Sequence, residues 1–239
     1  MEKKKERIAK FIAGAGYCSR RDAERLIEQG MVTVNGVKLT TPAFLVDGLE
    51  EIVVQGKPVT ANETVRLWCY HKPAGLITTH KDPKGRPTVF ASLPAYLPRV
   101  ISVGRLDFNS EGLLLLTTSG ALARQLELPS NAWKRKYRVR VHGLVTPEII
   151  KRLAQGVTIK GQKYAPMMLK VERQQGTNCW CEATLTEGKN REIRKIMEFL
   201  GLPVTRLIRI SYGPFQLGNL PAGEVREVTQ KALKELKCV

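Results

Sequence analysis

The sequence predicts an α+β protein with two units, a small helix-helix-hairpin unit followed by a larger, sheet-rich mixed domain. Three observations carry this prediction. Apolar residues recur at helical spacing early in the chain and are followed by an alternating run around an Asn-Gly pair. A polar segment without a sustained apolar pattern then places a boundary near residue 64, which gives units at 1–64 and 65–239. Beyond that boundary, strand patterns alternate with helix patterns.

The first helix and the hairpin are predicted by spacing and turn chemistry. Ile8, Phe11 and Ile12 recur at helical spacing, and glycines then interrupt the pattern. The run MVTVNGVKL contains two alternating segments around Asn35-Gly36, a pair that readily takes the positive φ angles of a tight hairpin turn.

The second helix has a well-marked start between these elements. Ser19 can accept a hydrogen bond from the amide of Asp22, whose carboxylate also suits the positive end of a helix. Gly30 stands where a left-handed cap would end the helix. We therefore expect a helix from Arg20 to about Gln29.

The second unit contains strands, capped helices and one polar loop between apolar strands. Helices are predicted over residues 120–127 after Ser119, from Thr146-Pro147 to Gly156, and over NREIRKIMEFLG. Strands are predicted in LWCYHKP, on both sides of the loop in ISVGRLDFNSEGLLLLTTSG, and in KYRVRVHG, VTIKG, MMLKVER and CWCEATLTEG.

The charge of the chain predicts a polyanionic partner, with nucleic acid as the first candidate. Lys and Arg number 39 against 22 Asp and Glu, a formal charge of +17. Residues 1–64 hold 10 of these basic and 9 of these acidic side chains, which leaves 29 against 13 for residues 65–239. We therefore expect the polyanion to lie mainly against the second unit.

The cysteines and the apolar runs predict a reduced, cytoplasmic protein. The five cysteines are scattered and form no C-x-x-C pair: Cys18, Cys69, Cys179, Cys181 and Cys238. The charged start MEKKKERIAKF lacks the apolar core of a signal peptide, and no apolar run approaches the roughly 20 residues that span a bilayer. We expect no membrane partner and no metal.

The N-terminal stretch RIAKFIAGAGYCSRRDAERLIEQGMVTVNG resembles the S-four-type RNA-binding domain over nearly all of residues 5–55. The resemblance implies RNA contacts for Lys10, Arg20, Arg21 and Arg25. The alternative for each of them is an ordinary solvated helix face.

Asp107 is the candidate for chemistry in the second unit. It occupies the polar loop between two apolar strands, and such loops often hold catalytic groups because the strands fix them in place. Taken alone, the aspartate is more often a turn former.

Four stretches together resemble the RsuA-type pseudouridine synthases and match them in order and spacing across most of residues 66–228. They are HKPAG at 71–75, GRLDFNSEGLLLLT at 104–117, KRKYRV at 134–139 and TEGKNREIRKI at 186–196. The resemblance implies a core built on a mixed, mainly antiparallel sheet flanked by helices. Flanking segments are most similar to the branch that acts on large-subunit (23S) ribosomal RNA. The Asn-Ser pair at 109–110 departs from the threonine that many members have nearby.

The resemblance also assigns roles to residues. Asp107 is implied as the essential aspartate, Arg194 as its arginine partner and Tyr137 as the ring that stacks on the target base. Arg105 is implied to fill the space of the flipped nucleotide. Further RNA contacts are implied for Lys72, Lys189, Asn190, Arg191 and Ile193. The alternatives are a surface arginine at 194, core packing at 137 and 193, and a phosphate clamp at 105.

The implied reaction detaches uracil from its ribose, turns it and rejoins it through carbon-5, so that it needs no cofactor. Two other function classes stay open: a non-catalytic RNA-binding or ribosome-assembly factor, and a nucleoside-cleaving glycosylase. We expect a monomer that acts on ribosomal RNA, in naked form or within a pre-ribosomal particle.

Overall fold

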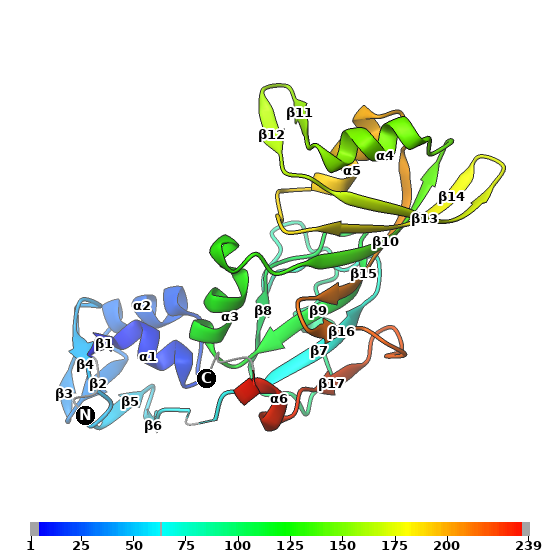
Figure 1. Ribbon diagram of the computed structural model, residues 1–239. Helices are drawn as coiled ribbons and strands as arrows, with labels where there is room; N and C mark the ends of the chain where they lie inside the picture. Colours follow the sequence, from blue (N-terminus) through cyan, green and yellow to red (C-terminus); the bar gives the residue numbers. More distant parts are fainter. Residues whose placement is uncertain (1–4, 63, 236–239) are drawn as a thin grey trace.

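The computed structural model describes residues 5–62 and 64–235, which form an N-terminal unit beside a domain built on one large sheet (Figure 1). No helix in these two ranges is long and apolar enough to cross a membrane. Cys238 lies outside the described residues. The other four cysteines, Cys18, Cys69, Cys179 and Cys181, are free thiols.

The N-terminal unit contains the expected two helices and hairpin, together with further short strands. The helices are α1 (Ile8–Gly14) and α2 (Arg20–Glu28). A four-stranded antiparallel sheet has the order β3 (Val37–Lys38), β2 (Val32–Val34), β5 (Ile52–Val54) and β6 (Lys57–Pro58). A separate pair joins β1 (Glu6–Arg7) to β4 (Leu45–Val46). Periodicity did not indicate β1, β4 or β6, because strands of two residues are too short to show an alternation.

The predicted caps and turn of this unit are confirmed. The hydroxyl of Ser19 accepts a hydrogen bond from the amide of Asp22 at 3.1 Å and caps α2. Gly30 has a φ of 66°, and Asn35 and Gly36 have φ of 49° and 78°, as a left-handed cap and a tight hairpin turn require. The cap fixes where α2 begins, and the turn fixes the register of the hairpin that packs beside it.

The large sheet is mixed and mainly antiparallel, as expected. Its only parallel pair among the described residues joins β9 to β15; every other pair is antiparallel. The strand order is β13 (Met168–Gln175), β14 (Asn178–Leu185), β10 (Arg135–His142), β15 (Val204–Tyr212), β9 (Glu111–Thr117), β7 (Leu67–Lys72) and β17 (Val225–Glu227). Two short strands extend it, with β8 (Ile101–Val103) on β9 and β16 (Phe215–Gln216) on β15.

Helices cover this sheet at both ends. The helices α4 (Pro147–Ala154) and α5 (Glu192–Phe199) lie together near β10, β13 and β14 (Figure 1), whose inward residues form one apolar cluster with them. The helices α3 (Gly120–Glu127) and α6 (Gln230–Glu235) cover the other end. A hairpin of β11 (Val157–Ile159) and β12 (Gln162–Tyr164) follows α4.

Helix α5 begins later than the sequence suggested. Its first residue is Glu192, and the preceding Arg191 has left-handed backbone angles, φ 51° and ψ 33°. The stretch Lys189-Asn190-Arg191 is therefore a loop that enters the helix rather than its first turn.

Strand β9 holds the loop that precedes it from the centre of the sheet. Its four leucines, 113 to 116, are fully buried, and alternate ones join apolar clusters on the two faces. Gly112 lies against the backbone of Arg209 in β15, where a Cβ would come within 2.3 Å of a carbonyl oxygen. The loop 104–110 therefore ends at a rigid strand, which fixes its position.

Candidate active site

The candidate active site is a cavity of about 360 Å³ between the loop 104–110, strand β10 and the loop that enters α5. Asp107 lines it from the first loop and Tyr137 from β10. The structure therefore brings together two residues that lie 30 positions apart in the sequence. Both are half-buried, so each keeps part of its side chain available to a ligand.

Lys72 holds the loop of Asp107 from inside. Its side chain is fully buried, and its ammonium donates hydrogen bonds to the carbonyl oxygens of Pro73 (3.0 Å), Phe108 (3.4 Å) and Ser110 (2.8 Å). Burial lowers the pKa of Lys72 from 10.5 to about 8, although the charge of Asp107 opposes that shift.

The burial of Lys72 bears on the RNA contact that was expected for it. A direct RNA contact does not fit an ammonium enclosed by backbone carbonyls at the end of β7. Its ammonium binds the backbone of the Asp107 loop, and a role in RNA binding stays a prediction. Thr78 supports the same loop, because its hydroxyl donates to the carbonyl oxygen of Leu106 at 3.0 Å.

Arg194 approaches the loop from α5. Its guanidinium donates to the carbonyl oxygens of Asn109 at 2.8 Å and Val204 at 3.1 Å. Burial and the nearby charge of Arg191 lower the pKa of Arg194, whereas the charge of Asp107 acts to raise it. Arg194 thus lies near the carboxylate of Asp107, but its hydrogen bonds go to backbone carbonyl oxygens. Its direct pairing with Asp107 stays a prediction.

Tyr137 lies where two apolar clusters meet. Its ring packs against the cluster under α5 and also against the cluster on the far side of β9. The pairing of β10 with β15 is irregular between Lys136 and Tyr137, and such bulges re-aim a side chain. The ring therefore combines core packing with a place on the cavity wall, and its stacking on a base stays a prediction.

The remaining implied contacts of the second unit take different positions. Arg105, Asn190 and Arg191 are exposed and line the cavity, whereas Ile193 lines it and is also buried in the core beneath α5. Lys189 lines the cavity too, but its ammonium is bound to the carboxylate of Glu187 at 2.8 and 2.9 Å.

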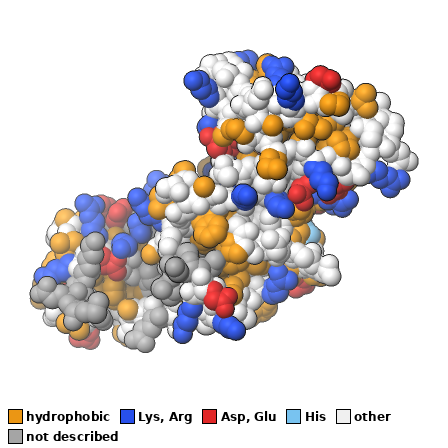
Figure 2. Space-filling view, viewed as in Figure 1, with side chains coloured by type: hydrophobic (Ala, Val, Ile, Leu, Met, Phe, Trp, Pro, Cys, Tyr) orange, Lys and Arg blue, Asp and Glu red, His pale blue; other side chains and the backbone are white. Residues whose placement is uncertain are grey.

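The four basic residues expected in the N-terminal unit do not line the Asp107 cavity. Lys10 pairs with Glu6 at 2.6 Å and Arg25 with Asp22 at 3.4 Å, whereas Arg20 and Arg21 are exposed. On the visible face, Lys and Arg side chains are spread over both units rather than gathered in one patch (Figure 2).

Several cavity residues were missed by the sequence reasoning. Arg135 and Tyr212 line the cavity and contact each other, with a hydrogen bond of 3.0 Å from the guanidinium to the phenol. Arg209 and Ser110 line it as well and are buried. Arg135 belongs to the stretch KRKYRV that carries the family resemblance. Arg209 could not be recognised as buried, because arginines alternate with apolar residues along β15 and any of them could face solvent.

Two of these buried groups keep unused hydrogen-bonding capacity. Within the described residues, Ser110 Oγ and Arg209 Nη2 have no hydrogen-bond partner. Buried polar groups without partners are costly and rare, so they often mark a place that a ligand completes. In the same part of the chain, no group of three or more His, Cys, Asp or Glu is placed to hold a metal ion.

Comparison with known proteins decides the family. The profile described as RNA pseudouridylate synthase matches residues 66–199, and the S4 domain profile matches residues 6–53. The chain belongs to the RNA pseudouridylate synthase family. Its members are isomerases, and this member carries an RNA-binding S4 domain at its N-terminus.

Relatives of this pseudouridine synthase extend over most of its length. A protein of Rickettsia felis, named as an uncharacterized RNA pseudouridine synthase, is 52% identical over 96% of this chain and all of its own. The ribosomal large subunit pseudouridine synthase B of Yersinia pestis is 40% identical over 97% of this chain and 75% of its own. The protein of the same name from Escherichia coli O6:H1 is 42% identical, with coverage of 91% and 77%.

A solved structure agrees with the fold. A crystal structure described as pseudouridylate synthase superposes with a TM-score of 0.69 at 26% sequence identity. It covers 96% of this chain and 99% of its own, so the likeness extends over both units.

Proposed function

We propose that this enzyme converts one specific uridine of large-subunit ribosomal RNA to pseudouridine, with Asp107 as the catalytic carboxylate acting on a nucleotide flipped out of the RNA. The names of the relatives in Yersinia pestis and Escherichia coli support the substrate class. The observation that carries the chemistry is that Asp107 and Tyr137, from two different elements, line one cavity together with the exposed Arg105 and Arg191.

The isomerisation is balanced within the substrate. The bond between ribose C1′ and uracil N1 breaks and leaves its electron pair on uracil, a bond from C1′ to C5 forms, and the proton lost from C5 is matched by one gained at N1. Catalysis needs a carboxylate beside the sugar, a wall that holds the detached base, and cations that stabilise negative charge. We assign these tasks to Asp107 and Tyr137, which line the cavity, and to Arg194, whose guanidinium binds the backbone of the same loop as Asp107.

The rim and the depth of the cavity suit different parts of a nucleotide. Phosphates stay attached to the RNA outside, so they meet exposed cations such as Arg105 and Arg191. The base enters furthest, where the Tyr137 ring can stack on it, a contact worth roughly 1–3 kcal/mol. Ser110 and Arg209 lie buried in the lining, with Ser110 Oγ and Arg209 Nη2 unpartnered among the described residues.

The decisive experiment compares catalysis and binding in one variant. Asp107→Asn is expected to lower the single-turnover rate by about 10²- to 10⁴-fold or more, because a carboxylate that acts in the reaction is lost. RNA affinity should change little, since one charge among many is removed. Glu227→Gln, which breaks an exposed pair with Arg66 away from the cavity, is the charge-matched control. Undiminished pseudouridine formation by Asp107→Asn would show that the assignment is wrong.

The substrate is tested by mapping pseudouridines in ribosomal RNA from cells with and without this gene. We expect one site to be lost in the large-subunit RNA. A loss confined to the small subunit contradicts the proposed substrate. Release of free uracil instead of pseudouridine would identify a glycosylase.

A further inference from the structure

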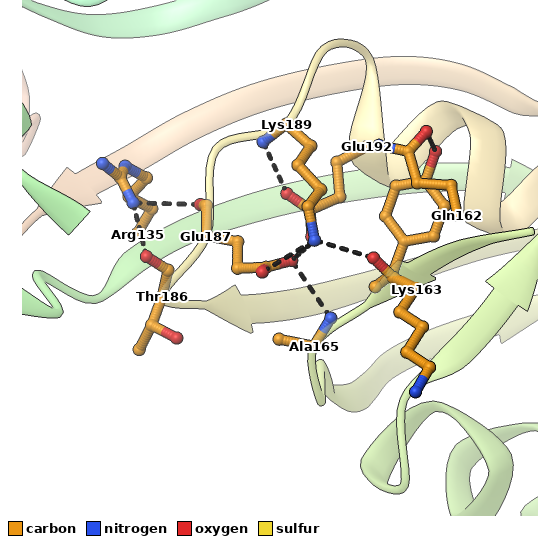
Figure 3. Close-up of polar contacts among 9 residues, drawn as sticks. Arg135, Gln162, Lys163, Ala165, Thr186, Glu187, Lys189 and Glu192 are labelled. Carbon is orange, nitrogen blue, oxygen red and sulfur yellow. Dashed lines mark hydrogen bonds and ion pairs between the residues drawn. The ribbon is translucent and has the colours of Figure 1, made fainter. Parts of the chain in front are cut away.

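The loop that enters α5 is tied to the β11–β12 hairpin by a compact charged network. The carboxylate of Glu187 accepts hydrogen bonds from Lys189 Nζ at 2.8 and 2.9 Å and from the amide of Ala165 at 3.0 Å. Lys189 Nζ also donates to the carbonyl oxygen of Lys163 at 2.7 Å. Two residues of the loop thus bind β12 and the residue that follows it, as Figure 3 shows.

A second set of contacts holds the loop from its other side. Arg135 Nη1 donates to the carbonyl oxygens of Thr186 at 2.7 Å and Glu187 at 2.9 Å. In Figure 3, Arg135 lies on one side of Glu187, with Lys163 and Ala165 on the other. The beginning of the loop is therefore clamped between β10 and the hairpin.

The end of the loop is fixed by the first residue of the helix. A carboxylate oxygen of Glu192 accepts a hydrogen bond from the amide of Lys189 at 3.0 Å, and the amide of Glu192 donates to the carbonyl oxygen of Lys189 at 3.2 Å. This reciprocal pair resembles a capping box. It leaves Asn190 and Arg191 projecting between two fixed points.

Arg191, between the two fixed ends of the loop, has a left-handed backbone conformation. A non-glycine residue in the left-handed region costs on the order of 1 kcal/mol or more and persists only where its surroundings determine it. Arg191 has φ 51°, is exposed and lines the cavity of Asp107. Without the contacts of Glu187 and Lys189, the loop could relax and move this guanidinium away from the cavity.

We propose that Glu187 and Lys189 are positioning residues of the synthase, which hold the loop 186–191 against the β11–β12 hairpin so that Arg191 and Ile193 face Asp107. The inference rests on the proposed function and extends it to two residues that touch no substrate. Lys189 is then an internal tie rather than the RNA contact that the resemblance implied.

The charge states of the network agree with this arrangement. Burial acts to raise the pKa of Glu187, but the hydrogen bonds from Lys189 and the amide of Ala165 outweigh it and lower that pKa. Burial, together with the charge of Glu187, raises the pKa of Glu192 to about 7. Glu187 is thus the ionised partner of Lys189, whereas Glu192 is partly protonated near neutral pH.

A positioning role and an RNA-clamp role predict different results for Lys189→Met. Loss of a phosphate contact would weaken RNA binding and leave the loop ordered. Loss of the tie would loosen the loop and slow the reaction of bound RNA, since a misplacement of about 1 Å can cost 10²-fold in rate. Measurements at saturating RNA separate the two.

The experiment uses the full chain and in vitro transcribed, unmodified large-subunit ribosomal RNA. The variants are Glu187→Gln, Lys189→Met and the conservative Lys189→Arg, with Glu227→Gln as the control. Glu227 at the end of β17 makes a bidentate pair with Arg66, the residue before β7, at 2.6 and 2.7 Å, outside the cavity. Each variant is measured for single-turnover rate, RNA affinity and hydrogen exchange of residues 162–166 and 186–192.

We expect Glu187→Gln and Lys189→Met to slow the bound-state reaction about 10- to 100-fold, with affinity within about threefold of wild type. Amide exchange should rise in both segments, Lys189→Arg should recover most of the rate, and Glu227→Gln should match wild type. Unchanged exchange in the two variants overturns the proposal, as does an unchanged rate despite faster exchange. A fall in affinity alone identifies the RNA clamp.

Failure of the proposed function gives a different pattern. If the wild-type enzyme forms no pseudouridine in this RNA, the substrate assignment fails. The exchange measurements still decide whether Glu187 and Lys189 hold the loop.

Discussion

Lys72→Met should change the pH dependence of stability in a way that only a buried amine can produce. The ammonium of Lys72 is fully enclosed and has a pKa lowered from 10.5 to about 8 by burial. At about 1.36 kcal/mol for each pKa unit, this shift corresponds to roughly 3 kcal/mol of cost for keeping the group charged in the folded protein.

The direction of the effect follows from proton binding. Between pH 8 and 10.5 the unfolded chain still binds the proton of Lys72, whereas the folded protein has released it. Stability therefore rises with pH in this window, and the cost is fully present below about pH 8. The wild type should gain about 3 kcal/mol relative to Lys72→Met between pH 7 and pH 10.5.

The assay is chemical denaturation of both proteins across this pH range, with the difference in unfolding free energy as the measured quantity. Titrations shared by the two proteins cancel in that difference. Lys57→Met, at an exposed lysine of β6, is the control and should show a nearly constant difference. A flat difference for Lys72→Met would refute the account of an enclosed, charged amine under the Asp107 loop.

Two further predictions concern stability. Gly112→Ala should cost about 3 kcal/mol or more, because its φ of 101° is unfavourable and its Cβ would lie 2.3 Å from the carbonyl oxygen of Arg209. Thermal unfolding measures this loss, and Gly85→Ala, with positive φ but open space, should lose much less. Glu192→Gln should remove a pH dependence. The folded pKa of Glu192, about 7, lies above the usual 4.5, so the wild type loses stability as pH rises through this window. Relative to the wild type, the unfolding free energy of the variant should therefore rise by up to about 3 kcal/mol between pH 5 and pH 8. An equal pH dependence in both proteins contradicts this reasoning.

Local sequence signals were sufficient for the elements that have local causes. Ser19 caps α2, and Asn35-Gly36 turns the hairpin, because the responsible atoms lie within a few residues of each other. The placement of Asp107 in a loop between apolar strands was visible for the same reason, and the family resemblance supplied Tyr137 as its neighbour.

What the sequence could not predict depends on contacts between distant segments. The family resemblance implied an RNA contact for Lys72, yet carbonyls up to 38 residues away bind its buried ammonium. An RNA contact was implied for Lys189 too, but its ammonium is bound to Glu187 and to the carbonyl oxygen of Lys163 in β12. The role of a cation depends on whether the fold brings acceptors to it, and spacing along the chain carries no information on that.

The loop around Asp107 is held almost entirely by its main-chain oxygens, which Lys72, Thr78 and Arg194 bind. Main-chain atoms are common to all residue types, so substitutions at 108 and 109 leave these attachments intact. The enzyme can therefore vary the side chains next to its carboxylate without moving the carboxylate itself.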